Sequence, residues 1–203
     1  MRLTKVIQKQ ANGEPVWHII LAVVIAIGLQ LLLSDSLVLG SKYVTGVLEA
    51  ILLIVLILPG IGQVIKRLLS IGLIGLIASL NLVSLGLVVH ALITGEHSNG
   101  HQLLLSSVAI YLTNIIVFGI MYWELDETKP DEADFLFPQF ASNKEWTPTF
   151  FDYLYVSVTN ATAFSPTDTL PLTHRAKLLM TVQGITALIT IALVTARAVN
   201  ILG

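Results

Sequence analysis

Long apolar runs separated by short polar segments dominate the chain. Five runs are long enough to cross a bilayer, because about 20 apolar residues in a helix match a hydrocarbon core about 30 Å thick. These predicted spans are residues 16–33, 44–64, 68–93, 103–123 and 176–199. Polar, proline or glycine residues separate them, as expected where helices end. The pattern predicts an all-α membrane protein with five transmembrane helices.

A sixth predicted helix is too short to span. Thr147 is a candidate N-cap and Pro148 a candidate first-turn residue, which predicts a helix over 148–161, about 20 Å long. Pro166 and Pro171 then break helix twice, so the backbone of 164–171 has no regular partners. At membrane depth such backbone is stable only inside protein or along a water-filled cavity. We therefore expect one re-entrant helix, which enters and leaves the membrane on the same side.

The stretch 152–173, DYLYVSVTNATAFSPTDTLPLT, resembles the pore domain of the tetrameric potassium-channel superfamily. The match has no gap. Residues 152–155 resemble the aromatic start of the pore helix, Asp168 the acidic residue after the selectivity filter, and 171–173 the turn into the inner helix. The resemblance implies a potassium-channel-like pore domain at the C-terminus of a homotetramer. The segment FSPTDTLPLT…RAK also resembles sequences of a group of uncharacterised, channel-related bacterial membrane proteins. This resemblance implies that the protein is located in the bacterial inner (plasma) membrane.

The filter positions depart from the family pattern. The family's T-V-G-Y-G glycines let successive carbonyls point into the pore and replace the hydration shell of potassium. Here that place is taken by residues with side chains and by a proline of fixed φ, so potassium selectivity is not implied. The predicted pore and filter residues are Thr162, Ala163, Phe164, Ser165, Pro166, Thr167 and Asp168.

These features predict a weakly selective channel for monovalent cations, an ion-transport function. An alternative of another class stays open, namely a non-conducting membrane scaffold or sensor that retains the channel fold. A third hypothesis is a proton-coupled carrier that uses Glu49 or His90.

Two sets of residues are candidates for contact with ions. Four copies of Asp168 around one axis would concentrate cations, although an Asx turn or a structural hydrogen bond explains this residue equally well. Gln183, Thr186 and Thr190 share one face of the last helix and are predicted to line a cavity below the filter. Threonines in membrane helices more often bond to their own backbone or to a neighbouring helix.

The longest polar stretch, 124–149, is rich in carboxylates. In a channel it would form an acidic rim at the pore mouth, whereas the alternative is a solvated loop with an apolar clip, 135–138, on the membrane surface. The acidic residues concerned are Glu124, Asp126, Glu127, Asp131, Glu132 and Asp134.

Few polar groups fall within the predicted spans, and each is costly in lipid. Asn81 and Asn114 are expected to form hydrogen bonds between helices. Glu49 lies one or two turns inside its helix, close enough to the interface to reach water. Gln30 and His90 are expected to face protein or water.

Composition excludes several function classes. Apolar residues make up 55% of the 203 residues and charged residues 12%; the mean hydropathy of +0.82 belongs to a membrane protein. The net charge of −2 and the lack of a basic cluster predict no nucleic-acid partner. With no cysteine, no metal-ligand spacing among the histidines and no catalytic constellation, we expect neither cofactor nor enzymatic activity.

The predicted organisation has three parts. Residues 1–15 form a polar N-terminal segment, 16–95 a three-helix peripheral bundle, and 101–203 the outer helix, acidic loop, pore helix and inner helix. The expected partners are the lipid bilayer and further copies of the chain.

The membrane orientation is predicted in two conflicting ways. The resemblance implies a pore loop facing outward. Five basic residues on one side, against two on the other, place it on the cytoplasmic face, and we favour this charge rule. The five are Arg2, Lys5, Lys9, Lys66 and Arg67, and the two are Lys42 and Arg197.

Overall fold

The structure is a computed structural model that describes residues 17–58, 62–94, 100–126, 133–142, 146–163 and 168–202. Most of these residues are helical. In chain order the elements are α2 (Trp17–Leu31), the 3-10 helix η1 (Asp35–Leu37), α3 (Lys42–Ile57), α4 (Gln63–Thr94), α5 (Gly100–Leu125), β1 (Phe135–Leu136), α6 (Gln139–Ser142), α7 (Phe150–Ala161), β2 (Leu170–Pro171) and α8 (His174–Leu202).

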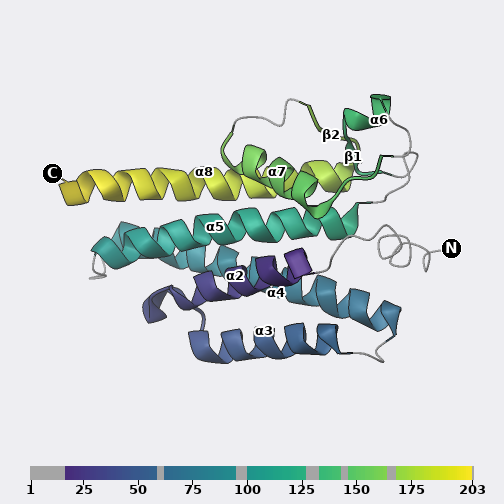
Figure 1. The fold of residues 1–203 in the computed structure, drawn as a ribbon. Coiled ribbons are helices and arrows are strands. Elements are labelled where there is room, and N and C mark those ends of the chain that lie inside the picture. Colours follow the sequence, from purple (N-terminus) through teal and green to yellow (C-terminus); the bar gives the residue numbers. More distant parts are fainter. Residues whose placement is uncertain are drawn as a thin grey trace.

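The helix α5 is the centre of the bundle. It contacts α2 and α4 on one side and α7 and α8 on the other, while α3 packs on α2 and α4 at the outer edge (Figure 1). The burial of α5 follows from this position: Ile110, Val117 and Tyr122 are all at most 1% exposed. The C-terminal part of the chain is therefore attached to the N-terminal helices through α5.

Three helices are long and apolar enough to cross a membrane: Leu68–Thr94 within α4, Gly100–Leu125, and His174–Ala196 within α8. They mark the chain as a membrane protein. The other two apolar helices, α2 and α3, have 15 and 16 residues, fewer than the roughly 20 that an untilted span requires. The structure thus shows three candidate spans where the sequence predicts five.

The predicted boundary between the second and third spans is wrong. Residues 63 and 64 were expected at the end of the second span, but α3 ends at Ile57 and α4 begins at Gln63. Lys66 and Arg67 end the apolar run without ending the helix, because lysine and arginine are good helix formers. As a result α4 has 32 residues.

Apolar clusters fill the space around α5 at both of its ends. Near the end of α5, Val117 and Ile120 pack with Ala22 and Ala26 of α2 and with residues of α4. Near its start, a second cluster joins Leu33 and Leu37, which follow α2, to the C-terminal half of α4. The backbone N–H of Ser34 donates to Ser106 Oγ of α5 at 3.3 Å. The turn between α2 and α3 therefore lies at the N-terminal end of α5.

The predicted hydrogen bond between helices is confirmed for Asn81, whose Nδ2 donates to the Ile110 carbonyl of α5 at 3.1 Å. It is wrong for Asn114, whose amide atoms have no hydrogen-bond partner among the described residues. Asn81 Oδ1 and Thr113 Oγ1 are likewise buried without a described partner. Unpaired groups of this kind cost about 1–3 kcal/mol each.

Candidate functional site: a short helix held between α5 and α8

The short helix α7 begins with a side-chain cap. Its N-cap is Thr149, with extended backbone, and Asp152 Oδ2 accepts from the Thr149 backbone N–H at 2.7 Å and from Thr149 Oγ1 at 2.8 Å. The predicted N-cap, Thr147, is therefore corrected by two residues, because the carboxylate three positions after Thr149 selects the start. The predicted end at Ala161 is confirmed. With 12 residues, α7 is about 18 Å long.

Gln183 of α8 is the hub of a buried polar network. Its side chain is 0% exposed. Gln183 Oε1 accepts from Tyr122 OH of α5 at 2.6 Å and from Asn160 Nδ2 of α7 at 2.8 Å. The Gln183 amide thus joins α5, α7 and α8. Because Tyr122 and Asn160 donate directly to it, α7 has little freedom to slide along the bundle.

Ser157 continues the network to the backbone of α5. Gln183 Nε2 donates to Ser157 Oγ at 2.6 Å and to the Ser157 carbonyl at 3.0 Å. Ser157 Oγ in turn donates to the Ile115 carbonyl at 2.6 Å. Each buried polar group of this part of α7 therefore has a partner, which is the condition for placing a polar helix inside an apolar bundle.

A glycine brings α7 close to α5. A Cβ atom on Gly119 would lie 3.2 Å from both Cα and Cδ1 of Leu154 and 3.6 Å from Ser157 Cβ. Because one of these neighbours is backbone, it cannot simply rotate away. The two helices approach one another at this point because residue 119 has no side chain.

After α7 the chain returns to the end of the bundle where α7 began. Ala163 has φ +57, the left-handed conformation that turns a chain after a helix. Residues 164–167, which hold the predicted filter positions Phe164, Ser165, Pro166 and Thr167, lie outside the described residues. The chain continues into β2, which pairs antiparallel with β1 in the register Phe135 to Pro171 and Leu136 to Leu170 (Figure 1).

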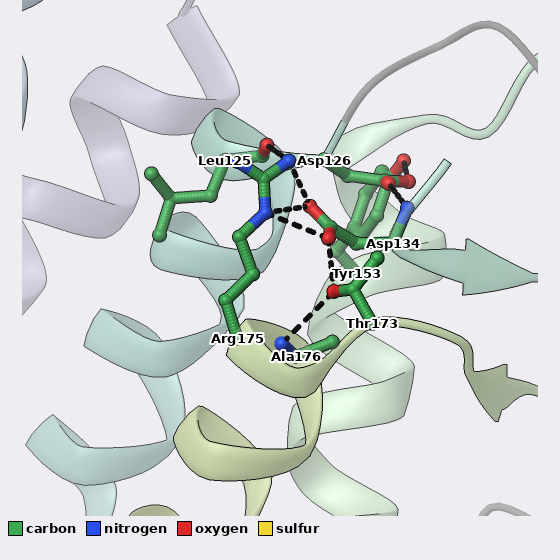
Figure 2. Close-up of polar contacts among 7 residues, drawn as sticks. All are labelled: Leu125, Asp126, Asp134, Tyr153, Thr173, Arg175 and Ala176. Atoms are coloured by element: carbon green, nitrogen blue, oxygen red, sulfur yellow. Dashed lines mark hydrogen bonds and ion pairs between the residues drawn. The ribbon is translucent and has the colours of Figure 1, made fainter. Parts of the chain in front are cut away.

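We call α7 together with the return of the chain to β2 the α7 hairpin. An ion pair holds the base of this hairpin. Figure 2 shows the Arg175 guanidinium facing the Asp134 carboxylate, with Arg175 Nε donating to Oδ1 and Oδ2 at 2.7 Å each. Arg175 Nη2 also donates to the Leu125 carbonyl at the end of α5, at 3.1 Å. Thr173 Oγ1 donates to Asp134 Oδ1 and accepts from the Ala176 N–H. The start of α8 is thereby joined to the segment that follows α5.

A second carboxylate connects this base to α7. Asp126 Oδ2 accepts from Tyr153 OH of α7, and Asp126 Oδ1 accepts from the Asp134 N–H, both at 2.5 Å (Figure 2). Phe135 and Phe137 pack edge-on against the Tyr153 ring, with centroid distances of 6.1 and 5.3 Å. Polar and aromatic contacts together fix the place where α7 enters the bundle.

The expectation of an acidic rim is wrong for two of its six residues. Asp126 and Asp134 are 3% and 2% exposed and accept hydrogen bonds inside the fold. Glu124 is half-buried, and Glu127, Asp131 and Glu132 lie outside the described part of the chain. The apolar clip 135–138 is also placed differently: Phe135 and Phe137 are buried in an aromatic cluster with Tyr122 and Tyr153.

The three predicted cavity residues are buried within the single chain, which differs from the expectation that they line a central cavity. Gln183 is the hub described above. Thr186 and Thr190 are at most 4% exposed and donate to carbonyls of their own helix, Val182 at 2.8 Å and Thr186 at 2.7 Å. These residues do share a face of α8, but that face is turned toward the rest of the same chain.

Of the predicted pore positions that the structure describes, Thr162 and Ala163 follow the last turn of α7, and Asp168 lies two residues before β2. Thr162 is half-buried and donates to the Val158 carbonyl at 2.8 Å, whereas Ala163 and Asp168 are exposed. The structure brings together residues that sequence reasoning did not group, namely Tyr122, Asn160 and Gln183, and the pair Asp134 and Arg175. The partners lie up to 61 residues apart, so no local spacing in the sequence links them.

The described residues contain no group of three or more histidines, cysteines, aspartates and glutamates able to hold a metal ion. Comparison with known proteins gave no matching family model, no matching curated protein and no matching solved structure. The functional argument therefore starts from the hairpin around α7 and from the contacts that hold it.

Proposed function

We propose that the chain is the protomer of a homotetrameric, weakly selective cation channel in the bacterial inner membrane, with five membrane-crossing helices and α7 as a re-entrant pore helix. The observation that carries the proposal is the hairpin itself. A helix of 12 residues enters the bundle between α5 and α8, ends near the middle of both, and the chain returns to the same end. Short helices of this kind at membrane depth occur where they border a polar pathway or protein interior.

An apolar surface on α7 and α8 supports assembly. It contains Phe151 and Tyr155 of α7 and Leu178, Ile185 and Leu188 of α8, each at least 50% exposed in the single chain. Four copies around one axis would cover part of this surface, and a single hairpin per chain needs cyclic symmetry to enclose a pathway.

The end of α7 supports weak rather than strong selectivity. No glycine occurs from residue 162 to 168, so the stacked carbonyl cage of a potassium filter is not expected there. Asp168, two residues before β2, is exposed, and its charge would attract cations without choosing between potassium and sodium.

A second candidate function is a non-conducting membrane scaffold or sensor with the same fold. One observation favours it: Gln183, Thr186 and Thr190, the polar face of α8, are buried within the protomer. The exposed side of α8 carries Leu178, Ile185 and Leu188, which suit lipid or protein contact better than water.

Two measurements test the channel. Native mass measurement in nanodiscs should give a tetramer, and a monomer would end the model. Purified protein in planar bilayers under bi-ionic conditions should then give a reversal potential close to that of equal potassium and sodium permeability. If a verified tetramer carries no current at varied voltage, tension and pH, the result would instead support the scaffold function.

A further inference from the structure

A carboxyl group is buried among the three N-terminal helices. Glu49 of α3 is 0% exposed, although the opposite side of the same helix exposes Val44, Val47 and Ile51. Leu52 and Leu53, one turn further along α3, pack against the apolar cluster formed by α2, α4 and α5. Glu49 therefore points from an apolar helix into an apolar interior, away from the lipid-facing side.

Gln30 of α2 lies between this carboxyl and a carbonyl of α4. One terminal atom of the Gln30 amide is 2.9 Å from Glu49 Oε1 and 3.1 Å from Oε2. The other is 3.5 Å from the Ile77 carbonyl oxygen. Either end can carry the nitrogen, because an amide occupies the same volume in both orientations.

The two protonation states of Glu49 select opposite orientations of this amide. If Glu49 is protonated, its O–H donates to Gln30 Oε1, and Gln30 Nε2 donates to the Ile77 carbonyl. If Glu49 is ionised, Nε2 must face the carboxylate, and Oε1 then faces the Ile77 carbonyl, which is oxygen against oxygen. The protonated state lets both ends of the Gln30 amide form a hydrogen bond, one with the acid O–H and one with the Ile77 carbonyl, whereas the ionised state keeps the bond to Glu49 and loses the one to Ile77.

The cost of burial points the same way. A buried carboxylate is tolerated when a cation or several donors stabilise it. Here the partner found among the described residues is one neutral amide. A neutral carboxylic acid avoids most of that cost in an apolar, membrane-embedded interior.

The other titratable residues of α3, and those of the helices packed on it, lie far from the Glu49 site along the helix axes. Tyr43 and Lys42 of α3 are six and seven residues away, about 9–10 Å of helix rise. Relative to the contact residues Gln30 and Ile77, His18 of α2 is twelve residues away, and Arg67, Lys66 and His90 of α4 are ten or more, at least about 15 Å. Asp35, in the turn after α2, is exposed.

We propose that Glu49 is a membrane-embedded proton-binding site, with Gln30 as the residue that accepts its proton in a hydrogen bond. This inference goes beyond the proposed channel and does not depend on conduction; it rests on the proposed placement of α2 and α3 in the membrane. The site gives the packing of α2, α3 and α4 a dependence on one proton, because release of that proton would force the Gln30 amide to turn and lose the Ile77 carbonyl.

The first test is reaction with a lipid-soluble carbodiimide near neutral pH, using the full chain in nanodiscs. The protonated carboxyl adds across a C=N bond: its oxygen bonds to the central carbon, its proton passes to nitrogen, and an acyl shift gives a stable N-acylurea with no leaving group. We expect one adduct per chain, on the peptide that contains Glu49. An adduct elsewhere, or none, would overturn the proposal.

Two variants localise the adduct. Glu49→Gln keeps the size and neutrality of the protonated acid, so it should fold with an unchanged or higher melting temperature and lose the adduct. Asp35→Asn is the matched control, an exposed carboxylate in the neighbouring turn, and should keep the adduct in full. Equal labelling of wild type and Glu49→Gln would contradict the assignment.

Infrared spectroscopy gives a second readout that does not depend on reagent access. Wild type near neutral pH should show the carbonyl stretch of one protonated carboxylic acid that is missing in Glu49→Gln. In Gln30→Leu this band should remain and move to higher frequency, because the acid has lost its hydrogen-bond acceptor. Absence of the band in wild type would show an ionised Glu49, and an unmoved band in Gln30→Leu would exclude Gln30 as partner.

Discussion

Arg175 and Asp134 form a bidentate pair between segments 41 residues apart, with Arg175 Nη2 2.5 Å from Asp134 Oδ2 and the Asp134 side chain 2% exposed. The guanidinium side chain is half exposed, which weakens the pair through solvent screening. The Asp134 carboxylate has no such access to water. Leaving this carboxylate without its partners should therefore destabilise the fold more than leaving the Arg175 guanidinium without its own. The pair holds the start of α8 against the end of α5.

Removing this pair should loosen the base of the hairpin. We expect Asp134→Asn and Arg175→Gln each to lower the melting temperature in detergent, with a coupling energy of about 0.5–3 kcal/mol in the double-mutant cycle, as for residues in contact. Additive effects of the two single changes would show that the pair contributes through its separate contacts with Thr173 and Leu125.

The close approach at Gly119 predicts opposite effects of two similar substitutions. Gly119→Ala places a methyl group 3.2 Å from the backbone of Leu154 and should destabilise the protein by about 1–3 kcal/mol. Gly86→Ala in α4 meets nothing within 4 Å and should be neutral or stabilising by up to about 1 kcal/mol, because alanine favours helix. Equal melting temperatures of the two variants would exclude tight packing between α5 and α7.

Replacing Gln183 distinguishes a structural hub from a cavity-lining residue. Gln183→Leu removes the acceptor of Tyr122 and Asn160 and the donor to Ser157, so stability should fall by about 1–3 kcal/mol for each group left unpaired. Thr181→Val is the control, since Thr181 is exposed and bonds to its own helix at the Lys177 carbonyl. A change in conductance with unchanged melting temperature would instead place Gln183 along a conducting pathway.

The exposed Asp168 predicts a salt-dependent effect on conduction. Asp168→Asn preserves size and removes the charge, so single-channel conductance should fall most at low ionic strength and approach the wild-type value at high salt, where screening already cancels the field. Paired recordings in dilute and concentrated potassium chloride measure this. An equal loss at all concentrations, together with a weaker oligomer, would identify Asp168 as a structural residue.

The fold places two exposed serines at opposite ends of the bundle, which allows a test of orientation. Ser36 follows α2 at the N-terminal end of α5, and Ser142 ends α6 near the C-terminal end of α5. The chain has no cysteine, so single thiols at these sites have no background. If the charge rule holds, a membrane-impermeant maleimide labels Ser36→Cys in intact cells and Ser142→Cys after lysis. The reverse pattern would restore the outward-facing pore.

Much of the helical layout could be predicted, because apolar runs and caps are local signals. The interiors of α4, α5 and α8 and the end of α7 at Ala161 follow from them. The start of α4 was missed because Lys66 and Arg67 look like a boundary by charge and yet favour helix. The limits of α2 and α3 were overestimated because apolar residues such as Leu32, Leu33 and Leu58 continue the run beyond the helices.

The contacts that hold the candidate site could not be predicted in the same way. The burial of Asp134 depends on Arg175, and that of Gln183 on Tyr122 and Asn160, which come from distant parts of the chain. Gly119 gave no signal, because a glycine in an apolar helix looks the same whether it is packed or open. Sequence reasoning found the short helix and its turn, while the partners that hold it appear once the helices are placed together.

The anchoring of α7 by a later helix has a consequence for how the protein is made. Ser157 and Asn160 leave the ribosome before Gln183, which follows Ser157 by 26 residues. Until α8 has been translated, both side chains lack their bonds to Gln183, although the Ile115 carbonyl that Ser157 binds is already present. A 12-residue helix is also shorter than the roughly 20 residues of a span. The docking of α7 in the bundle is therefore completed only after α8 has been made.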